Sequence, residues 1–207
     1  MKRIGNAKRV QRYLGHSDVA TTLRFYVDVF PEDLKRAAEL LSEKKGEIMR
    51  KLKLYIETSV WNFFFADDAP EKRDITKQFF AAIEEGLYEI YISEVVVREI
   101  NNAPEPKRTT LFNLVNKYNP AELESTQEAN KLAELYIGRG IIPQNKREDG
   151  FHVAIATVFE MDAVISWNYR HLASLRKAEL FNSVNLESGY TKRLEIVTPM
   201  EVSKDED

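Results

Sequence analysis

The chain is organised around Lys53-Leu-Tyr-Ile-Glu-Thr-Ser-Val60. Its first half is typical of a short buried strand, and the strand is followed at once by Glu57, Thr58 and Ser59. Because ligands of open α/β sheets bind at the carboxyl ends of the strands, an acid at this point is a candidate for a functional site. The alternative is that Glu57 only caps a helix or belongs to a turn.

Strand and helix patterns alternate after Met49. We expect strands over 52–56, 88–92, 121–124, 163–166 and 194–197. Between them we expect helices over 71–85, 93–101, a stretch ending at 117, 125–139 and 149–160, followed by two short helical stretches before the last strand. Ser125-x-x-Glu128 has the form of a capping box. This alternation predicts an α/β domain with a mostly parallel sheet and helices on both faces.

The composition limits the class of protein. The chain has 207 residues, enough for one domain and a modest appendage. It has no cysteine, which excludes disulfides and thiolate metal sites and fits a reducing compartment. No run of 18 apolar residues is present, and the first residues carry no apolar segment of the kind that signal peptides need. We therefore expect a cytoplasmic protein without a membrane span.

Charge is unevenly distributed along the chain. Residues 1–48 carry 10 Lys/Arg and 7 Asp/Glu, whereas residues 49–207 carry 20 and 26. The main body thus has a net charge of −6, against +3 for the first segment. An acidic body does not favour tight non-specific binding to nucleic acid, but it suits a site that concentrates cations.

The segment 1–48 has a helical pattern and too few apolar residues for a core of its own. Its residues Val10–Tyr26 contain Leu-Gly-His-Ser-x-x-x-x-Thr-x-x-x-Tyr, which resembles the C-terminal tail of tyrosine recombinases (phage integrases). The resemblance implies a phosphate-binding role for His16 and a nucleophilic role for Tyr26. The other residues that this chemistry needs to neutralise phosphoryl oxygens are missing, so we interpret the segment as a recombinase remnant. The alternative is a fragment that binds a partner recombinase.

Met49 directly precedes the first predicted strand. A second start at this methionine would make residues 1–48 a fusion or a wrongly assigned start. The intact mass of the natively expressed protein would distinguish these origins.

Three acids and one amide are placed where they can meet. Glu57 ends the first strand, Glu99 lies in the helix after the second, Asp149 opens the helix before the fourth, and Asn168 follows the fourth. If the first and fourth strands are neighbours, all four side chains face one crevice. Carboxylates so close repel each other unless a cation lies between them, and oxygen ligands select Mg²⁺ or Mn²⁺. Such a site suits phosphodiester hydrolysis.

Other polar and aromatic residues have simpler interpretations. The alternative for Asp149 is that it only caps its helix. Two histidines allow both a structural and a functional role: His152, placed with apolar neighbours, is expected as a hydrogen-bonded core residue, and His171 as a surface residue or one at the pocket mouth. Among the other acids, we expect Glu94 in the first turn of a helix, Glu148 in solvent and Asp162 in a turn. The aromatic residues Trp61 and Phe63–Phe65 are expected in the core, in a dimer contact or on a surface that stacks on bases.

Four stretches together resemble the PIN domain family of metal-dependent ribonucleases, which includes the VapC toxins. They are Tyr55-Ile-Glu-Thr-Ser-Val60, Ile92-Ser-Glu-Val-Val-Val-Arg-Glu-Ile100, Glu148-Asp-Gly-Phe-His-Val-Ala-Ile-Ala156 and Val164-Ile-Ser-Trp-Asn-Tyr-Arg-His171. The resemblance implies a three-layer α/β/α domain over 49–202 with strand order 3-2-1-4-5, followed by a polar tail, 203–207. It also implies that Glu57, Glu99 and Asp149 bind the metal, that Asn168 takes the position of a fourth acid, and that Thr58 or Ser59 supplies the positioning hydroxyl.

Two positions depart from the family pattern. The first acid is Glu57 where the family usually has Asp, and the fourth position is Asn168, which brings no charge. We expect the second of these to weaken a second metal site most. The resemblance further implies an RNA substrate, a small antitoxin as partner, and a homodimer. The alternative is a catalytically weak or inactive protein that keeps the fold as a nucleic-acid-binding or scaffold module.

Overall fold

The computed structural model describes residues 50–202. The recombinase-like segment 1–48 and the tail 203–207 lie outside the described residues, so the interpretations of both stay predictions.

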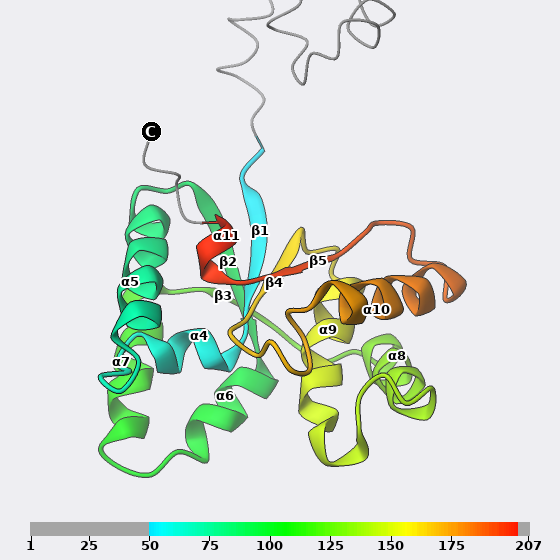
Figure 1. Cartoon of the computed structure of the whole chain (residues 1–207), viewed down its shortest axis with the longest axis horizontal. Helices are drawn as coiled ribbons and strands as arrows, with labels where there is room; N and C mark the ends of the chain where they lie inside the picture. Colours follow the sequence, from blue (N-terminus) through cyan, green and yellow to red (C-terminus); the bar gives the residue numbers. More distant parts are fainter. Residues whose placement is uncertain (1–49, 203–207) are drawn as a thin grey trace, which may run out of the picture. The chain divides into compact units, whose positions relative to one another are not determined.

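Five parallel strands form one sheet with the order β3-β2-β1-β4-β5 (Figure 1). Strand β1 lies at the centre, with β2 and β4 as its neighbours. Its last three residues, 54–56, are fully buried, which explains why the strand is apolar on both faces. The predicted α/β class and strand order are therefore confirmed. The strands are β1 (Leu52–Ile56), β2 (Tyr88–Ser93), β3 (Ala121–Leu123), β4 (Ala163–Ile165) and β5 (Glu195–Val197).

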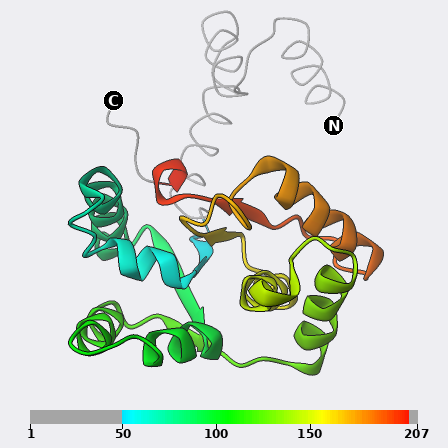
Figure 2. The ribbon, with the colours of Figure 1, turned by 60° about the horizontal axis from the view of Figure 1, so that its bottom comes forward.

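Helices flank the sheet on both sides. Figures 1 and 2 show α4, α5 and α7 on one side and α8, α9 and α10 on the other, while α6 lies near the carboxyl ends of the strands. The helices are α4 (Thr58–Phe63), α5 (Pro70–Glu84), α6 (Glu94–Asn101), α7 (Lys107–Tyr118), α8 (Gln127–Gly138), α9 (Arg147–Val158), α10 (Leu175–Glu187) and α11 (Pro199–Val202), with a short 3₁₀ helix, η1 (Gln144–Lys146).

Local signals in the sequence set most helix ends. Pro70 occupies the first turn of α5, where its missing N–H costs nothing, and Gly86 follows that helix with a φ of +77°. Ser93 caps α6 by accepting a hydrogen bond from the backbone N–H of Val95 at 3.2 Å. These three signals fix the ends of α5 and the start of α6, which is the helix that carries Glu99.

Three local predictions were wrong. The cap of α8 is Thr126, whose hydroxyl accepts from the N–H of Ala129 at 3.1 Å, and not Ser125. Helix α9 begins at Arg147, two residues earlier than predicted, so Asp149 lies inside its first turn. A single helix, α10, replaces the two predicted short stretches, because Ala178, Phe181 and Val184 give it one continuous buried face.

Helix α9 is buried along most of its length. Seven of its residues are buried, from Gly150 to Thr157, and His152 is among them with no exposed surface. A helix that is packed all round shows no single apolar stripe. This burial places the residues after Asp149 in the interior, next to β1 and α6.

Candidate metal centre

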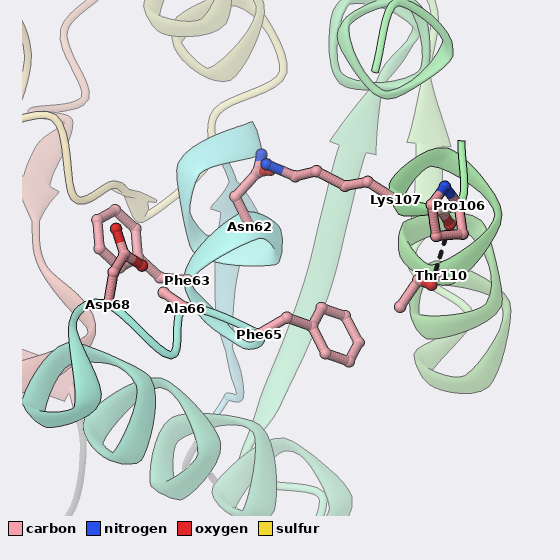
Figure 3. Close-up of a pocket in the computed structure, with 8 residues that line it drawn as sticks. All are labelled: Asn62, Phe63, Phe65, Ala66, Asp68, Pro106, Lys107 and Thr110. Carbon is pink, nitrogen blue, oxygen red and sulfur yellow. Dashed lines mark hydrogen bonds between the residues drawn. The ribbon is translucent and has the colours of Figure 1, made fainter. Parts of the chain in front are cut away.

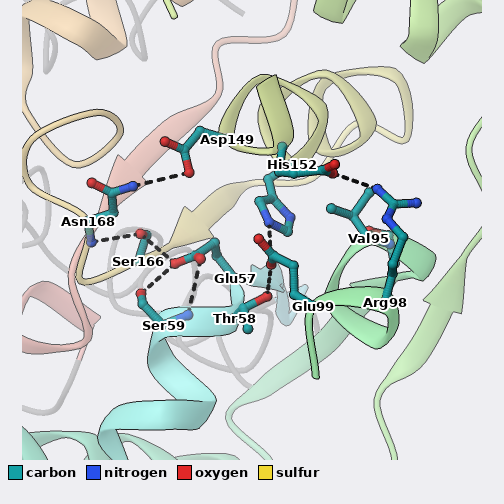
Figure 4. A network of polar contacts seen from close by, with 12 residues as sticks. Glu57, Thr58, Ser59, Val95, Arg98, Glu99, Asp149, His152, Ser166 and Asn168 are labelled. Carbon is teal, nitrogen blue, oxygen red and sulfur yellow. Dashed lines mark hydrogen bonds and ion pairs between the residues drawn. The ribbon is translucent and has the colours of Figure 1, made fainter. Parts of the chain in front are cut away.

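Glu57 lies at the junction of β1, β4 and α4. Its backbone N–H donates to the carbonyl of Ile165 at 3.1 Å, which extends the pairing of β1 with β4 by one step. Its carboxylate caps α4 by accepting from the N–H of Ser59 at 3.1 Å. The hydroxyls of Ser59 and of Ser166, the latter at 2.8 Å, donate to Oε2 (Figure 4). The predicted capping role of Glu57 is thus real and is combined with burial in the site.

The loop after β4 is bound to the same carboxylate. The backbone N–H of Trp167 donates to the hydroxyl of Ser59 at 2.9 Å, and that of Asn168 donates to the hydroxyl of Ser166 at 2.9 Å. Each serine therefore connects this loop to Glu57. Burial raises the pKa of Glu57, and this effect outweighs the opposing influence of His152 and of the two serines.

Glu99 approaches the site from α6. Its Oε2 accepts a hydrogen bond from the hydroxyl of Thr58 and lies 3.1 Å from Nε2 of His152. Burial acts to raise the pKa of this carboxyl, but the hydrogen bond and charge of His152, with the hydrogen bond from Thr58, outweigh it and hold the pKa below its ordinary value. Glu99 is therefore the acid of the site that most readily carries its charge.

Asp149 enters from the first turn of α9. Its Oδ1 accepts a hydrogen bond from the side-chain amide of Asn168 at 3.2 Å, and its Oδ2 is buried without a hydrogen-bond partner in the described part of the chain. Burial raises the pKa of this carboxyl, the charge of Glu99 raises it further, and His152 and His171 oppose both. The amide oxygen of Asn168 accepts from the backbone N–H of His171 at 3.1 Å, so both ends of that side chain are engaged.

The side chains of Glu57, Glu99 and His152 form a group with the geometry of a metal site. One ligand atom of each lies within 4.8 Å of the others, and all three come from elements that meet at the carboxyl ends of β1 and β4. The group is therefore a candidate site for a metal ion of unassigned identity. Within residues 50–202, Asp149 lies outside this group and is joined to it through the hydrogen bonds of Asn168 and Ser166 (Figure 4).

The predicted site residues are thus brought to one edge of the sheet. The two hydroxyls are divided between the acids: Thr58 binds Glu99, and Ser59 binds Glu57. Asn168 contacts Asp149 directly, a contact the sequence did not indicate. The catalytic and metal-binding roles of these residues stay predictions.

Two members of the site were not identified from the sequence. His152 was expected as a hydrogen-bonded core residue, and it is one, but it also lies between the carboxylates. Its position three residues after Asp149 on one helix face was the available signal. Ser166 was missed; its signal was that it follows β4 as Glu57 follows β1.

Three acids judged structural lie away from the group. Glu148 forms an ion pair with Arg98 at 2.5 Å on the surface, and Asp162 accepts from the backbone N–H of Lys53 at 2.7 Å. Glu94 belongs to the first turn of α6. These positions agree with the interpretations given to them from the sequence.

A separate pocket of about 540 Å³ lies between the end of α4 and the start of α7 (Figure 3). Asn62 and Lys107 reach toward each other across it, and Phe65, which is 42% exposed, belongs to its wall. Trp61, by contrast, is fully buried and packs on Phe80 with ring centroids 5.1 Å apart. Of the aromatic run, Trp61 is therefore core, and Phe65 presents a ring to solvent.

The chain matches no protein-family model and no curated protein sequence. Among the helices of residues 50–202, none has the combination of length and apolar character that crossing a membrane requires.

Proposed function

We propose that this protein is a metal-dependent nuclease that hydrolyses phosphodiester bonds in RNA. The observation that carries the proposal is Oδ2 of Asp149, which is buried and has no hydrogen-bond partner within residues 50–202, on a side chain that Asn168 and Ser166 join to the group containing Glu57 and Glu99. A buried carboxylate oxygen without a partner is costly, and a bound cation removes that cost. The donor set therefore fits a metal ion.

Carboxylate oxygens favour Mg²⁺ or Mn²⁺ over softer metals. In this proposal Glu57, Glu99 and Asp149 would hold the ion, which would supply an activated water and positive charge beside the scissile phosphate. The surrounding residues keep these acids in place: Ser59 and Ser166 orient Glu57, Thr58 orients Glu99, and Asn168 orients Asp149. Preorganised ligands of this kind lower the cost of assembling the reactive geometry.

The choice of RNA as substrate is supported by the resemblance of four sequence stretches to PIN domain ribonucleases. The pocket beside α4 supplies an exposed ring, Phe65, and a cation, Lys107. Proteins that bind single-stranded nucleic acids use aromatic rings to stack on bases and cations to contact phosphates. Helix α4 has Glu57 as its N-cap and the pocket at its other end. An RNA strand lying in the pocket would therefore run along α4 toward the acids.

Cleavage of a mixed RNA pool tests the proposal. We expect the purified chain to cleave with Mg²⁺ or Mn²⁺, to be inactive in EDTA, and to lose activity at least 100-fold in Asp149→Asn, which removes a ligand charge but keeps the shape. Glu148→Gln is the matched control, since it alters the neighbouring acid on the outer face of α9. Cleavage in EDTA, or an Asp149→Asn variant as active as the control, would contradict the proposal.

The second candidate function is a nucleic-acid-binding or scaffold protein without catalysis. It is favoured by the fact that Glu57 accepts three hydrogen bonds and caps α4, so this acid has a structural role that needs no metal. Calorimetry with Mn²⁺ separates the two functions. Mn²⁺ binding that is lost in Asp149→Asn supports the nuclease, and the absence of such binding supports the scaffold protein.

We further propose that the nuclease acts as a toxin held inactive by a small antitoxin, on the strength of the family resemblance. Expression of the chain in a bacterium is expected to stop growth, and Asp149→Asn is expected to relieve the arrest. Equal growth inhibition by both chains at equal protein levels would contradict a toxin role that depends on this site.

A further inference from the structure

A line of buried hydrogen bonds runs beneath the acids. Nε2 of His152 lies 3.1 Å from Oε2 of Glu99, and Nδ1 lies 2.7 Å from the hydroxyl of Tyr55. That hydroxyl lies 2.6 Å from Oγ of Ser93, which accepts from the backbone N–H of Val95. His152 and Tyr55 have no exposed surface. The line therefore connects α9, β1 and the start of α6, the helix that carries Glu99.

The chemistry of the groups fixes the direction of the decisive bond. An ionised carboxylate can only accept, so the contact between Glu99 and His152 is a hydrogen bond only when Nε2 carries a proton. If the ring is neutral, Nδ1 is an acceptor and receives a hydrogen bond from the hydroxyl of Tyr55. If the ring is charged, Nδ1 donates to the same hydroxyl. In both states both ring nitrogens are engaged by protein groups, Nε2 by Glu99 and Nδ1 by Tyr55.

We propose that His152 is a positioning residue for Glu99 and not a ligand of the metal. Its Nε2 proton and the hydroxyl of Thr58 both point to Oε2 of Glu99, so Oε1 is the oxygen of this carboxylate that remains for an ion. This inference rests on the proposed metal site and completes its ligand set as oxygen only: Glu57, Glu99 and Asp149. An oxygen-only set selects Mg²⁺ or Mn²⁺, whereas an imidazole in the set would favour Zn²⁺.

The protonation of His152 can be read without any metal. Nitrogen NMR of the full chain labelled with ¹⁵N-histidine reports which ring nitrogen carries hydrogen, and His152→Gln identifies the signal among the three histidines. We expect a proton on Nε2 both in the metal-free chain and after Mg²⁺ is added. An Nε2 that is unprotonated in the Mg²⁺-loaded chain would overturn the inference.

Mn²⁺ binding gives a second, independent reading. Pulsed EPR of the Mn²⁺-loaded chain is expected to show no coupling to a histidine nitrogen; a coupling that disappears in His152→Gln would show direct ligation. Glutamine can present an N–H at about the reach of Nε2, so His152→Gln is expected to keep the Mn²⁺ dissociation constant within about threefold. His152→Leu offers no such group and is expected to weaken Mn²⁺ binding roughly 10- to 100-fold, the usual effect of losing a group that orients a ligand.

Equal weakening in the glutamine and leucine variants, with both folded by circular dichroism, would contradict the positioning role. Failure of the proposed function has a different signature. A chain that binds neither Mg²⁺ nor Mn²⁺ contradicts the metal site, while the NMR of the metal-free protein still decides the protonation of His152.

Discussion

Asn168 is an amide placed among the acids of the site, and both ends of its side chain are engaged. Its amide donates to Asp149 at 3.2 Å, and its carbonyl oxygen accepts from the N–H of His171. A carboxylate in this place would face Asp149 without a proton to donate, and the two like charges would repel each other. The asparagine therefore holds Asp149 in position by a hydrogen bond instead of repelling it.

Asn168→Asp tests this interpretation. We expect the metal-free variant to be less stable by about 1–3 kcal/mol, because it exchanges a hydrogen bond for a repulsion between partly buried acids. We also expect Mn²⁺ titration to show a second bound ion, since a cation between the two acids removes the repulsion. Thermal unfolding with and without Mn²⁺ measures both effects, and a variant as stable as the native chain without metal would contradict the account.

Helix α9 is the element that brings the site together, because it carries Asp149 and His152 on one face and is buried along most of its length. Gly150 lies between these two residues. A Cβ built there would meet nothing nearer than 3.8 Å, so the space for a methyl group is already present. The glycine is therefore not required by packing and costs the helix conformational entropy.

Gly150→Ala is expected to stabilise the chain by about 0.5–1 kcal/mol, since alanine restricts the unfolded state and fits the helix. The control is Gly140→Ala: Gly140 has a φ of +70°, where alanine is strained, and we expect a loss of roughly 1–2 kcal/mol. Urea unfolding measures both. Destabilisation by Gly150→Ala would mean that the helix has no room at this point.

The cap of α8 offers a second test at the scale of an element. Thr126 accepts from the N–H of Ala129, whereas the neighbouring Ser125 was predicted as the cap. Thr126→Ala is expected to cost about 1 kcal/mol, and Ser125→Ala close to nothing. The reverse order in urea unfolding would show that the helix begins one residue earlier than the structure places it.

The stability of the whole molecule depends on the protons that its buried groups hold. Burial raises the pKa of Glu57 and of Asp149, and although burial acts to lower the pKa of His152, its contact with Glu99 raises it overall. The folded, metal-free chain therefore binds more protons than the unfolded chain as the pH rises above the ordinary pKa of each group. Its free energy of unfolding falls with rising pH across this range. Glu99, with its lowered pKa, acts oppositely, but only in more acidic solution.

We therefore expect a lower melting temperature at pH 8 than at pH 5.5 in EDTA. Mg²⁺ at ten times its dissociation constant should add about 1.4 kcal/mol at pH 8, or roughly 2–5 °C. Asp149→Asn should show less of the pH effect and none of the Mg²⁺ effect. A native chain whose melting temperature rises from pH 5.5 to pH 8 in EDTA would contradict the sign of these shifts.

Most of the strands and helices, and the edge of the sheet at which the acids lie, could be predicted from the sequence. A continuous apolar run before Glu57 is typical of a strand buried on both faces, and alternation with helices favours parallel pairing, so the acids after these strands were expected at one edge of the sheet. The order of the strands and the roles of the acids came from the family resemblance, and the structure confirms the order alone.

Which side chains touch across the fold follows from the packing of the elements. Ser59 and Glu57 meet locally, within the cap of α4. The contacts of Asn168 with Asp149, and of His152 and Thr58 with Glu99, by contrast join residues far apart in the chain. No local pattern specifies such contacts, because they depend on the packing distance between α6, α9 and the sheet. Helix α10 depends on packing in the same way, because Ala178, Phe181 and Val184 become one buried face only where the helix covers the core.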